Sequence, residues 1–471
     1  MNDLSSHASE RKPCQVRPIV ARAVSSVVGS IVMNLTYRKY EEKEKFDRLI
    51  ELMQEGFRLF TIAMPLDFIP ILRFLPGVSY AYKKMKRNRA ETSAFFQGVA
   101  DEHRRYLSKT FNLTTGAQAG DEDADECITN GLSNNASEQA DQQRHMRRQL
   151  KQPLHPKQQQ QLYSSNKTTC SNRISSIYSH QDVSAAPNAT CRPEMIRQQR
   201  EDGADSDKTH IELDNIVARD LVDAYIVQQK KHETDGKENY FSDQQLVQIM
   251  SDIFSAGLET VTSTIEWSIL FLILNPECQQ RIQDEIDKVI GRDRVPQLLD
   301  LSRMPYTEAT IYEVLRRSNV VALGNAHATL ADASIAGYRI PRGTQVLPNL
   351  YGIHMNPKLW HEPNQFNPSR FIVNDKAQKP DYFMPFSVGR RMCLGDVLAK
   401  MEVFLFLVGL LQKYDLSVAE EDRDCPPQVK GTIGVSNTPV PFRVALSHHQ
   451  QQRVDSNSND TTETATPTAT V

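Results

Sequence analysis

The sequence predicts a mainly α-helical fold with small β-sheets. Three observations support this class: apolar residues recur at helical spacing over long segments, prolines and glycines punctuate those segments, and only short stretches have strand character. Two further segments have the composition of disordered chain. The helical part is therefore expected to be interrupted by an internal insert.

Residues 1–111 hold the first helical part. The apolar residues that recur there at spacings of three and four are Phe46, Leu49, Ile50, Met53 and Phe57. This spacing is typical of one buried helix face. Pro65, Pro70 and Pro76 follow, and proline ends a helix because it lacks the backbone N–H. We expect breaks at these positions.

Residues 112–208 and 448–471 are rich in Ser, Asn, Gln and Thr and poor in aromatic residues. Such segments cannot bury enough apolar area to offset the entropy lost on ordering. We predict a disordered insert and a disordered tail.

Residues 209–447 form the main predicted core. The expected helices are Ile211–Lys231, Asp243–Leu274, Glu277–Ile290, Pro305–Arg317 and Leu394–Gln412. Asn275–Pro276 is expected to stop the longest of them. A hairpin is predicted from Ser334, with turns at Gly337 and at Pro341–Gly343.

Composition excludes several classes. The formal net charge of −3 excludes a globally basic nucleic-acid binder. The seven cysteines have no paired spacing, which argues against a zinc site or a dithiol redox pair. The longest apolar runs, Ile269–Leu274 and Val403–Leu411, are shorter than the roughly 18 residues that span a bilayer. We expect no transmembrane or targeting segment in the chain.

One cysteine has an unusual setting. Cys393 lies between Gly389 and Gly395 immediately before a predicted helix, with Phe386 and Arg391 nearby. Free N–H groups at a helix N-terminus stabilise a thiolate, and glycines let a flat cofactor approach the backbone. Arg391 suits an anionic group on that cofactor. The alternative is a buried structural cysteine.

The complete pattern Phe-x-x-Gly-x-Arg-x-Cys-x-Gly resembles the haem-binding loop of the cytochrome P450 family. This resemblance implies a cytochrome P450 fold and haem b as cofactor. It further implies that Cys393 is the axial thiolate ligand of the haem iron, with Phe386, Gly389, Arg391 and Gly395 around it.

The predicted long helix contains Ala256-Gly257-Leu258-Glu259-Thr260. Glycine inside a helix costs about 1 kcal/mol relative to alanine, so Gly257 suggests a close approach, and the Thr260 hydroxyl can bond a carbonyl in the preceding turn. Taken alone, such a string is more often solvated or part of a core. Beside the cysteine pattern, it resembles the family's oxygen-activation motif, which implies that Glu259 and Thr260 deliver protons.

Further resemblances concern residues that support the structure and residues that line the substrate pocket. Glu313 with Arg316 matches the family's Glu-x-x-Arg motif. Taken alone, such a pair is ordinarily a surface ion pair, but the resemblance implies that Arg370 completes a buried charge network behind the haem, with a structural role. His327 matches a histidine that bonds a haem propionate, at the end of an expected pocket strand, residues 320–327. The substrate-pocket residues implied by the resemblance are Phe254, Ala256, Val321, Leu323 and Val435.

Three segments, residues 88–91, 220–223 and 390–402, resemble the insect ecdysteroid 26-hydroxylase group. That resemblance implies side-chain oxidation of a steroid hormone on the cytosolic face of the endoplasmic reticulum. Since no dinucleotide-binding fingerprint is present, electrons would come from a separate reductase. The family resemblance implies that this partner is an NADPH-dependent flavin reductase. Arg390 and Lys400 are expected to contribute to docking that reductase.

Two departures from the family are expected to matter. Residues 1–18 do not resemble the family's anchor, hinge and first helices, so part of the haem cradle is expected to be absent. The insert replaces a short loop. A gene-model artefact or a real isoform explains both. The alternative function is therefore a non-catalytic, truncated remnant that acts in interactions or regulation.

Overall fold

A computed structural model describes residues 2–10, 12–35, 40–63, 66, 69–115, 216–236, 240–432 and 434–449. The chain divides into two units, one made of residues 1–107 with 210–471 and the other of residues 108–209. The predicted insert and tail lie outside the described residues apart from their first few positions. All that follows concerns the first unit, together with the last turns of its helix α4.

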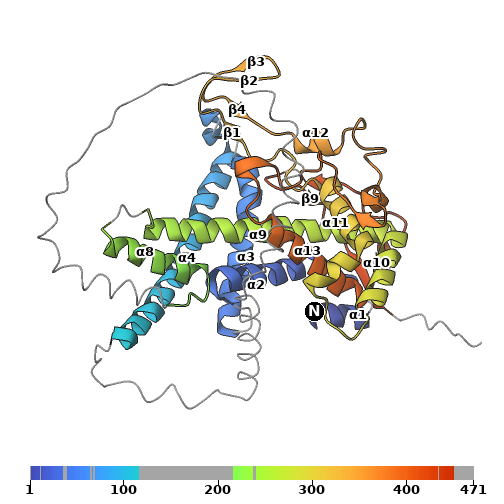
Figure 1. The fold of residues 1–471 in the computed structure, drawn as a ribbon, viewed down its shortest axis with the longest axis horizontal. Coiled ribbons are helices and arrows are strands. Elements are labelled where there is room, and N and C mark those ends of the chain that lie inside the picture. Colours follow the sequence, from blue (N-terminus) through green and yellow to red (C-terminus); the bar gives the residue numbers. More distant parts are fainter. Residues whose placement is uncertain are drawn as a thin grey trace, which may run out of the picture. The chain divides into compact units, whose positions relative to one another are not determined.

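The described part is mainly helical with small antiparallel sheets, which confirms the predicted fold class (Figure 1). Its α-helices are α1 (Asn2–Glu10), α2 (Arg17–Met33), α3 (Tyr40–Ala63), α4 (Pro76–Thr115), α8 (Leu221–Thr234), α9 (Asp243–Leu274), α10 (Pro276–Val289), α11 (Pro305–Ser318), α12 (Leu350–His354) and α13 (Asp396–Leu411). Short 3₁₀ helices are η2 (Pro70–Phe74), η3 (Leu298–Arg303), η4 (Pro368–Phe371), η5 (Gly389–Arg391) and η6 (Glu420–Asp422).

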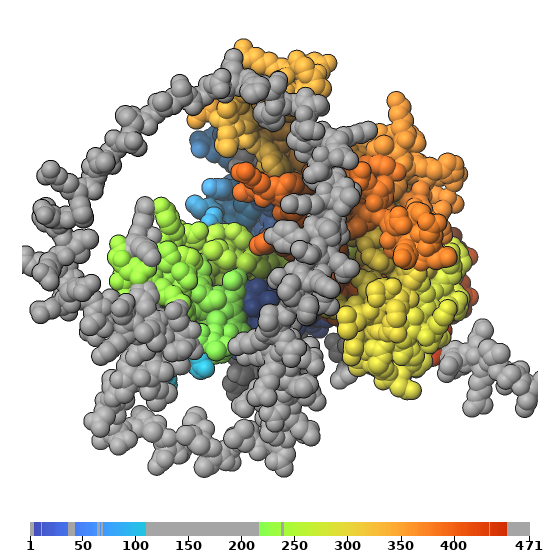
Figure 2. Space-filling model, in the orientation of Figure 1, coloured from blue at the N-terminus to red at the C-terminus, as the bar shows by residue number. Residues whose placement is uncertain are grey.

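The strands pair in two-stranded antiparallel sheets. The pairs are β1 (His327–Ala328) with β4 (Gln345–Val346), β2 (Ala333–Ile335) with β3 (Tyr338–Ile340), β5 (Ile372–Val373) with β6 (Lys376–Ala377), β7 (Tyr414–Val418) with β10 (Val444–His448), and β8 (Gly431–Thr432) with β9 (Thr438–Pro439). The β2–β3 turn, Ala336-Gly337, has positive φ at both residues, as a tight hairpin requires. This predicted hairpin projects at the top of the view in Figures 1 and 2.

Helix boundaries follow local capping. The Ser242 side chain accepts a hydrogen bond from the Gln245 N–H at the start of α9, and Asn275 with Pro276 ends the helix as predicted. The helix predicted to start at Ile211 was wrong at its beginning, because residues 216–220, the first described ones of that segment, are not helical. Asp220 caps the helix by accepting from the Asp223 N–H at 2.9 Å, so α8 begins at Leu221.

The core is built around α9. The Phe254 ring is fully buried, with its centroid 5.9 Å from that of Phe46 on α3 and 6.1 Å from that of Phe96 on α4. A Cβ on Gly257 would lie 3.0 Å from Val28 on α2, so this glycine does permit the close approach expected from the sequence. Among the described helices, α9 has the length and apolarity to cross a membrane, but most of it is buried in the protein.

The pocket strand expected at residues 320–327 was wrong. Residues 320–323 form a turn, closed by the Gly324 N–H donating to the Val321 carbonyl at 3.1 Å, and only His327 and Ala328 are in a strand. Asn319 and Gly324 have φ of 42° and 59°. These left-handed residues turn the backbone before and after Val321, which prevents an extended strand.

An ion pair joins α4 to the start of α8. The His103 Nε2 atom lies 2.8 Å from the Asp220 carboxylate, and its Nδ1 atom lies 2.8 Å from the Val99 carbonyl oxygen. Burial disfavours the charged imidazole, but both acceptors favour it, and the pKa of His103 is raised. The same buried pair contacts Asp223, whose carboxylate is bound by Arg219 at 2.6 Å. Arg219 supplies positive charge there, so we interpret this cluster as structural.

We expect His103→Gln to lower the free energy of unfolding by roughly 1.5–3 kcal/mol at pH 5.5, because a charged buried hydrogen bond is lost. A raised histidine pKa contributes stability that is complete below the ordinary value near 6.5 and is lost as pH rises through the folded-state value. The difference between variant and wild type should therefore shrink at pH 8.5. Urea unfolding at both pH values measures it, and a difference independent of pH would contradict the assignment.

Candidate functional site

The loop of residues 385–395, the cysteine loop, places Cys393 at the protein surface. The Cys393 thiol is free and exposed, and the Cys393 backbone N–H donates to the Phe386 carbonyl at 3.0 Å. This bond closes the loop back on itself just before α13 begins at Asp396, with Gly395 as its N-cap. The thiol therefore stands at the N-terminal end of a long helix, two residues before its N-cap.

Other loop residues leave space beside the thiol. Gly389 has φ of 81°, a conformation that glycine adopts without strain, and no atom lies within 4 Å of a Cβ built at Gly389 or Gly395. Arg391 is exposed, and no ion pair is recorded for it among the described residues. Phe386 is half-buried, with the Lys400 ammonium 5.0 Å from its ring centroid. The loop thus offers a thiol, a cation and an open backbone surface.

The carboxylate of Glu259 is buried and fully partnered. Both of its oxygens accept from the Arg17 guanidinium, at 2.7 and 2.9 Å, and one also accepts from the Ser436 hydroxyl at 2.9 Å. Arg17 also binds Glu266, two turns further along α9, at 2.5 Å. Burial raises the pKa of Glu266 to about 7 despite this contact, and Glu259 adds repulsion. Two carboxylates therefore share one arginine.

The remaining positions of the α9 motif differ in exposure. The Thr260 hydroxyl donates to the Ala256 carbonyl at 2.8 Å, the bond expected from the sequence. Ala256 is exposed and Thr260 is half-exposed, although most residues after them on α9 are buried. The part of α9 around Ala256 and Thr260 is therefore accessible to solvent. Phe254, by contrast, lies in the aromatic core described above.

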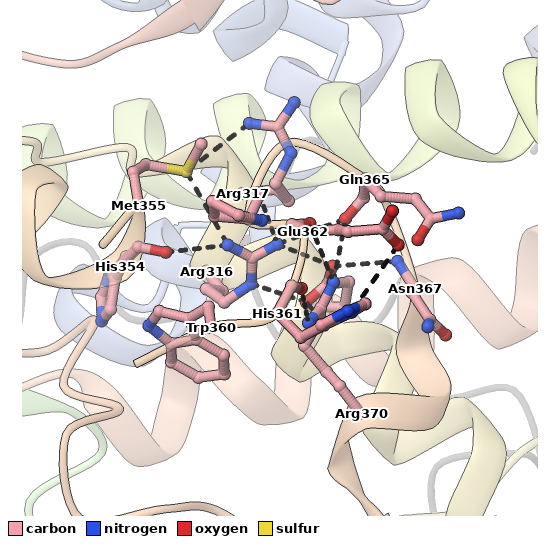
Figure 3. Close-up of polar contacts among 12 residues, drawn as sticks. Arg316, Arg317, His354, Met355, Trp360, His361, Glu362, Gln365, Asn367 and Arg370 are labelled. Carbon is pink, nitrogen blue, oxygen red and sulfur yellow. Dashed lines mark hydrogen bonds and ion pairs between the residues drawn. The ribbon is translucent and has the colours of Figure 1, made fainter. Parts of the chain in front are cut away.

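Glu313, Arg316 and Arg370 are brought together. Arg316 binds both Glu313 oxygens at 2.8 Å, and both side chains are completely buried. Arg370 on η4 adds a third contact to the Glu313 carboxylate at 3.2 Å. Arg316 also donates to the carbonyl of His354 at 2.8 Å (Figure 3). A further bond runs to the carbonyl of Pro363 at 2.9 Å. The pair is thus buried, unlike an ordinary surface ion pair.

The other predicted positions lie on turns and short strands. His327 is half-buried on β1, opposite Val346 of β4. Val321 is half-buried in the turn after α11, while Leu323 and Val435 have exposed fractions of 54% and 43%. Lys400 pairs with Asp396 at 2.7 Å, and Arg390 is exposed. Leu323 and Val435 are thus exposed apolar side chains, and their place in a substrate pocket stays a prediction.

The cytochrome P450 family model matches residues 1–148 and 191–446, which is most of the chain. The chain belongs to the cytochrome P450 family. It is 33% identical to cytochrome P450 18a1 of Drosophila melanogaster over 93% of this chain and 62% of that protein. It is also 39% identical to cytochrome P450 2U1 and 37% identical to cytochrome P450 2J2, both of Homo sapiens, over about half of this chain and 44% and 47% of those proteins. The chain thus spans less than two thirds of these relatives.

The residues present fit the haem of a cytochrome P450. A haem needs a soft axial ligand, cationic or hydrogen-bonding groups for its carboxylates, and an apolar surface for its ring. The exposed thiol of Cys393, the exposed guanidinium of Arg391 and the open backbone at Gly389 supply the loop side. The exposed Ala256 lies in the partly exposed first half of α9, which also exposes Gln248 and Asp252, just before the buried second half begins at Leu258.

Sequence reasoning missed several residues of this cytochrome P450. Glu266 lies seven positions after Glu259, a spacing that places both on one helix face and was readable from the sequence. Arg17 and Ser436 carried no such signal, because they come from α2 and the β8–β9 turn, far away in the chain. His354 was also missed, since a single buried histidine has no pattern around it.

Glu402 on α13 is a buried carboxylate whose two oxygens have no hydrogen-bond partner among the described residues. Burial raises the pKa of Glu402 to about 7. An acid whose folded-state pKa is raised destabilises the protein increasingly as pH rises from its ordinary value toward the folded value. The cost is complete above pH 7.

We therefore expect Glu402→Gln to stabilise the chain by roughly 2 kcal/mol at pH 8 and by much less at pH 5, because the amide stays neutral. Thermal or urea unfolding at both pH values measures the change. The matched control is Glu420→Gln, which removes an exposed carboxylate. Equal stabilisation at both pH values would show that Glu402 does not carry the charge.

Proposed function

We propose that this cytochrome P450 is a haem-thiolate monooxygenase that inserts one oxygen atom of O₂ into a C–H bond of a steroid-like substrate. The observation that carries the proposal is the exposed Cys393 thiol in the glycine-flanked loop at the start of α13. The thiolate of Cys393 would ligate haem b, and Arg391 with His327 would hold its propionates. The bound haem supplies the activation of O₂.

The chain's own residues would bind substrate and move protons. Thr260 is half-exposed on α9, and its hydroxyl donates to the Ala256 carbonyl. The hydroxyl can leave this carbonyl and form a hydrogen bond with a proton donor or acceptor in the site instead. Glu259 would supply protons to it when released from Arg17 and Ser436. Val321, Leu323 and Val435 would exclude water and contact an apolar substrate.

The proposed substrate is an ecdysteroid, oxidised at carbon 26, which would inactivate the hormone. The support is the resemblance of residues 88–91, 220–223 and 390–402 to the ecdysteroid 26-hydroxylase group, together with the 33% identity to cytochrome P450 18a1. Incubation with reductase and an ecdysteroid, followed by mass spectrometry of the products, tests the substrate and the position.

We further propose association with the cytosolic face of the endoplasmic reticulum membrane and electron supply from an NADPH-dependent flavin reductase. The support for a membrane surface is the apolar exposure on η2 and the start of α4, where Ile71, Phe74 and Tyr80 are 70%, 72% and 62% exposed. Arg390 and Lys400, on the cysteine-loop side, would contribute positive charge to reductase docking.

The ligand assignment predicts that Cys393→Ser abolishes the long-wavelength band of the reduced, carbon-monoxide-bound haem, because an alcohol does not replace the thiolate. Cys425→Ser is the matched control, since Cys425 is also free and exposed but lies outside the loop. A band that survives in Cys393→Ser would contradict the proposal. Failure of the wild-type chain to bind haem would favour the non-catalytic alternative.

Proton delivery predicts that Thr260→Ala lowers the yield of hydroxylated product per NADPH oxidised by roughly a hundredfold, which is the low end of a general acid–base contribution. Haem binding should be unchanged, because the side chain only bonds the Ala256 carbonyl within α9. Thr264→Ala is the control, since Thr264 makes the same type of bond to the Thr260 carbonyl. Equal product yields in the two variants would show that the Thr260 hydroxyl does not take part in proton delivery.

A further inference from the structure

His354, the last residue of α12, is buried to 1% exposure between the Glu313–Arg316 pair and the cysteine loop. Its Nδ1 atom lies 2.9 Å from the side-chain oxygen of Asn319. Its Nε2 atom lies 3.1 Å from the backbone nitrogen of Met384, the residue immediately before the cysteine loop. The imidazole thus bridges the end of α11 and the entrance to the loop.

The partners determine the protonation state of the ring. The Asn319 amide donates to the Arg316 carbonyl at 2.7 Å, so its oxygen is left to accept, and His354 must donate from Nδ1. Met384 N–H is a donor, so Nε2 must accept. Only a neutral imidazole with its proton on Nδ1 satisfies both bonds. Burial, with the nearby charge of Arg316, lowers the pKa of His354 to about 4 and keeps this form at neutral pH.

The end of α11 holds His354 in place at one end of this bridge. Asn319 has left-handed backbone geometry at the end of α11, and the Arg316 guanidinium donates to the carbonyl of His354 itself (Figure 3). The imidazole also packs against Phe383, with ring centroids 5.7 Å apart. Backbone and side chain of His354 are therefore both held by the end of α11.

At its other end, the bridge fixes the backbone of Met384, where the cysteine loop begins. The Met384 carbonyl accepts from the Ser387 N–H at 3.0 Å, and Ser387 has φ of 61°. The next bond along the loop, from the Cys393 N–H to the Phe386 carbonyl, closes it at the thiol. The backbone of Met384 is thus held at both of its polar groups: the N–H donates to His354, and the carbonyl accepts from Ser387 in the loop turn.

We propose that neutral His354 is a positioning residue that transmits the fixed geometry of the Glu313–Arg316 pair to the cysteine loop, so that the Cys393 thiolate remains the iron ligand. The inference rests on the proposed role of Cys393. Without His354 the Met384 N–H loses its buried acceptor and the loop entrance is released, so that Cys393 is held less firmly at the position of the proposed ligand.

The test compares His354→Phe, which keeps an aromatic ring and removes both bonds, with His354→Gln, whose amide can donate and accept. His448→Gln is the matched control on an exposed histidine of β10. In the full chain with haem, the ratio of the long-wavelength band of thiolate ligation to the shorter-wavelength band of thiol ligation should fall roughly tenfold in His354→Phe. It should recover at least partly in His354→Gln, and be unchanged in His448→Gln.

A second readout needs no haem. Hydrogen exchange at the Met384 amide should be at least tenfold faster in His354→Phe than in the wild type, while amides in the middle of α9 keep their protection. Asn319→Ala, which leaves Nδ1 without its acceptor, should change both readouts in the same direction. It replaces His354→Phe if that variant does not fold.

The outcomes separate the two proposals. Absence of the long-wavelength band from the wild-type chain would overturn the proposed ligation. A wild-type band with an unchanged band ratio in His354→Phe, or with unchanged exchange at Met384, would overturn the positioning role alone. A variant that only unfolds more easily, with a normal band ratio in its folded fraction, would reduce His354 to an ordinary core residue.

Discussion

The buried ion pair between Glu313 and Arg316 is the interaction on which the arrangement of the loops around the site depends. Taking both charges out of water costs several kcal/mol, and the pair is tolerated only because every charged group has partners. The Glu313 carboxylate also accepts from the backbone N–H of Asn367 at 2.9 Å and from Arg370. Arg316 donates to the carbonyl of His354 at the end of α12 and to that of Pro363 in the segment after it. Segments with little regular structure are thereby held to α11.

The environment of a carboxylate, more than its residue type, decides what it does in this protein. Glu313 lies in the interior and contacts two arginines, Arg316 and Arg370. Glu402 is equally buried without any partner among the described residues, and its raised pKa follows from desolvation. Glu259 and Glu266 lie between these cases, because they share Arg17. Among the described residues, Arg17 is the cation paired with both of these acids, near the proposed proton path.

Glu259 also joins elements that are far apart in sequence. Arg17 reaches it from α2, and Ser436 reaches it from the β8–β9 turn, beside Val435. The indole N–H of Trp267 on α9 donates to the Asn437 carbonyl at 2.8 Å in the same turn. The turn that carries a proposed substrate contact is therefore bonded to the helix that carries the proposed acid. Movement of this turn on substrate binding would act directly on the partners of Glu259.

The sequence by itself determined the elements whose signals are local. Helical periodicity and the Asn275–Pro276 stop located α9 at its observed ends, and the cysteine pattern identified the family. What depended on distant contacts was decided by the tertiary structure. Asn319 and Gly324 turned an expected strand, residues 320–327, into a loop. The spacing of Glu313 and Arg316 fits an ordinary surface pair as well as the buried network that the family resemblance implied, and packing of the fold buried the pair. Arg17 and His354 acquired roles only because folding brought α2 to α9 and α12 to the cysteine loop. Local patterns specify backbone conformation, whereas a side chain's environment is set by residues that no local pattern identifies.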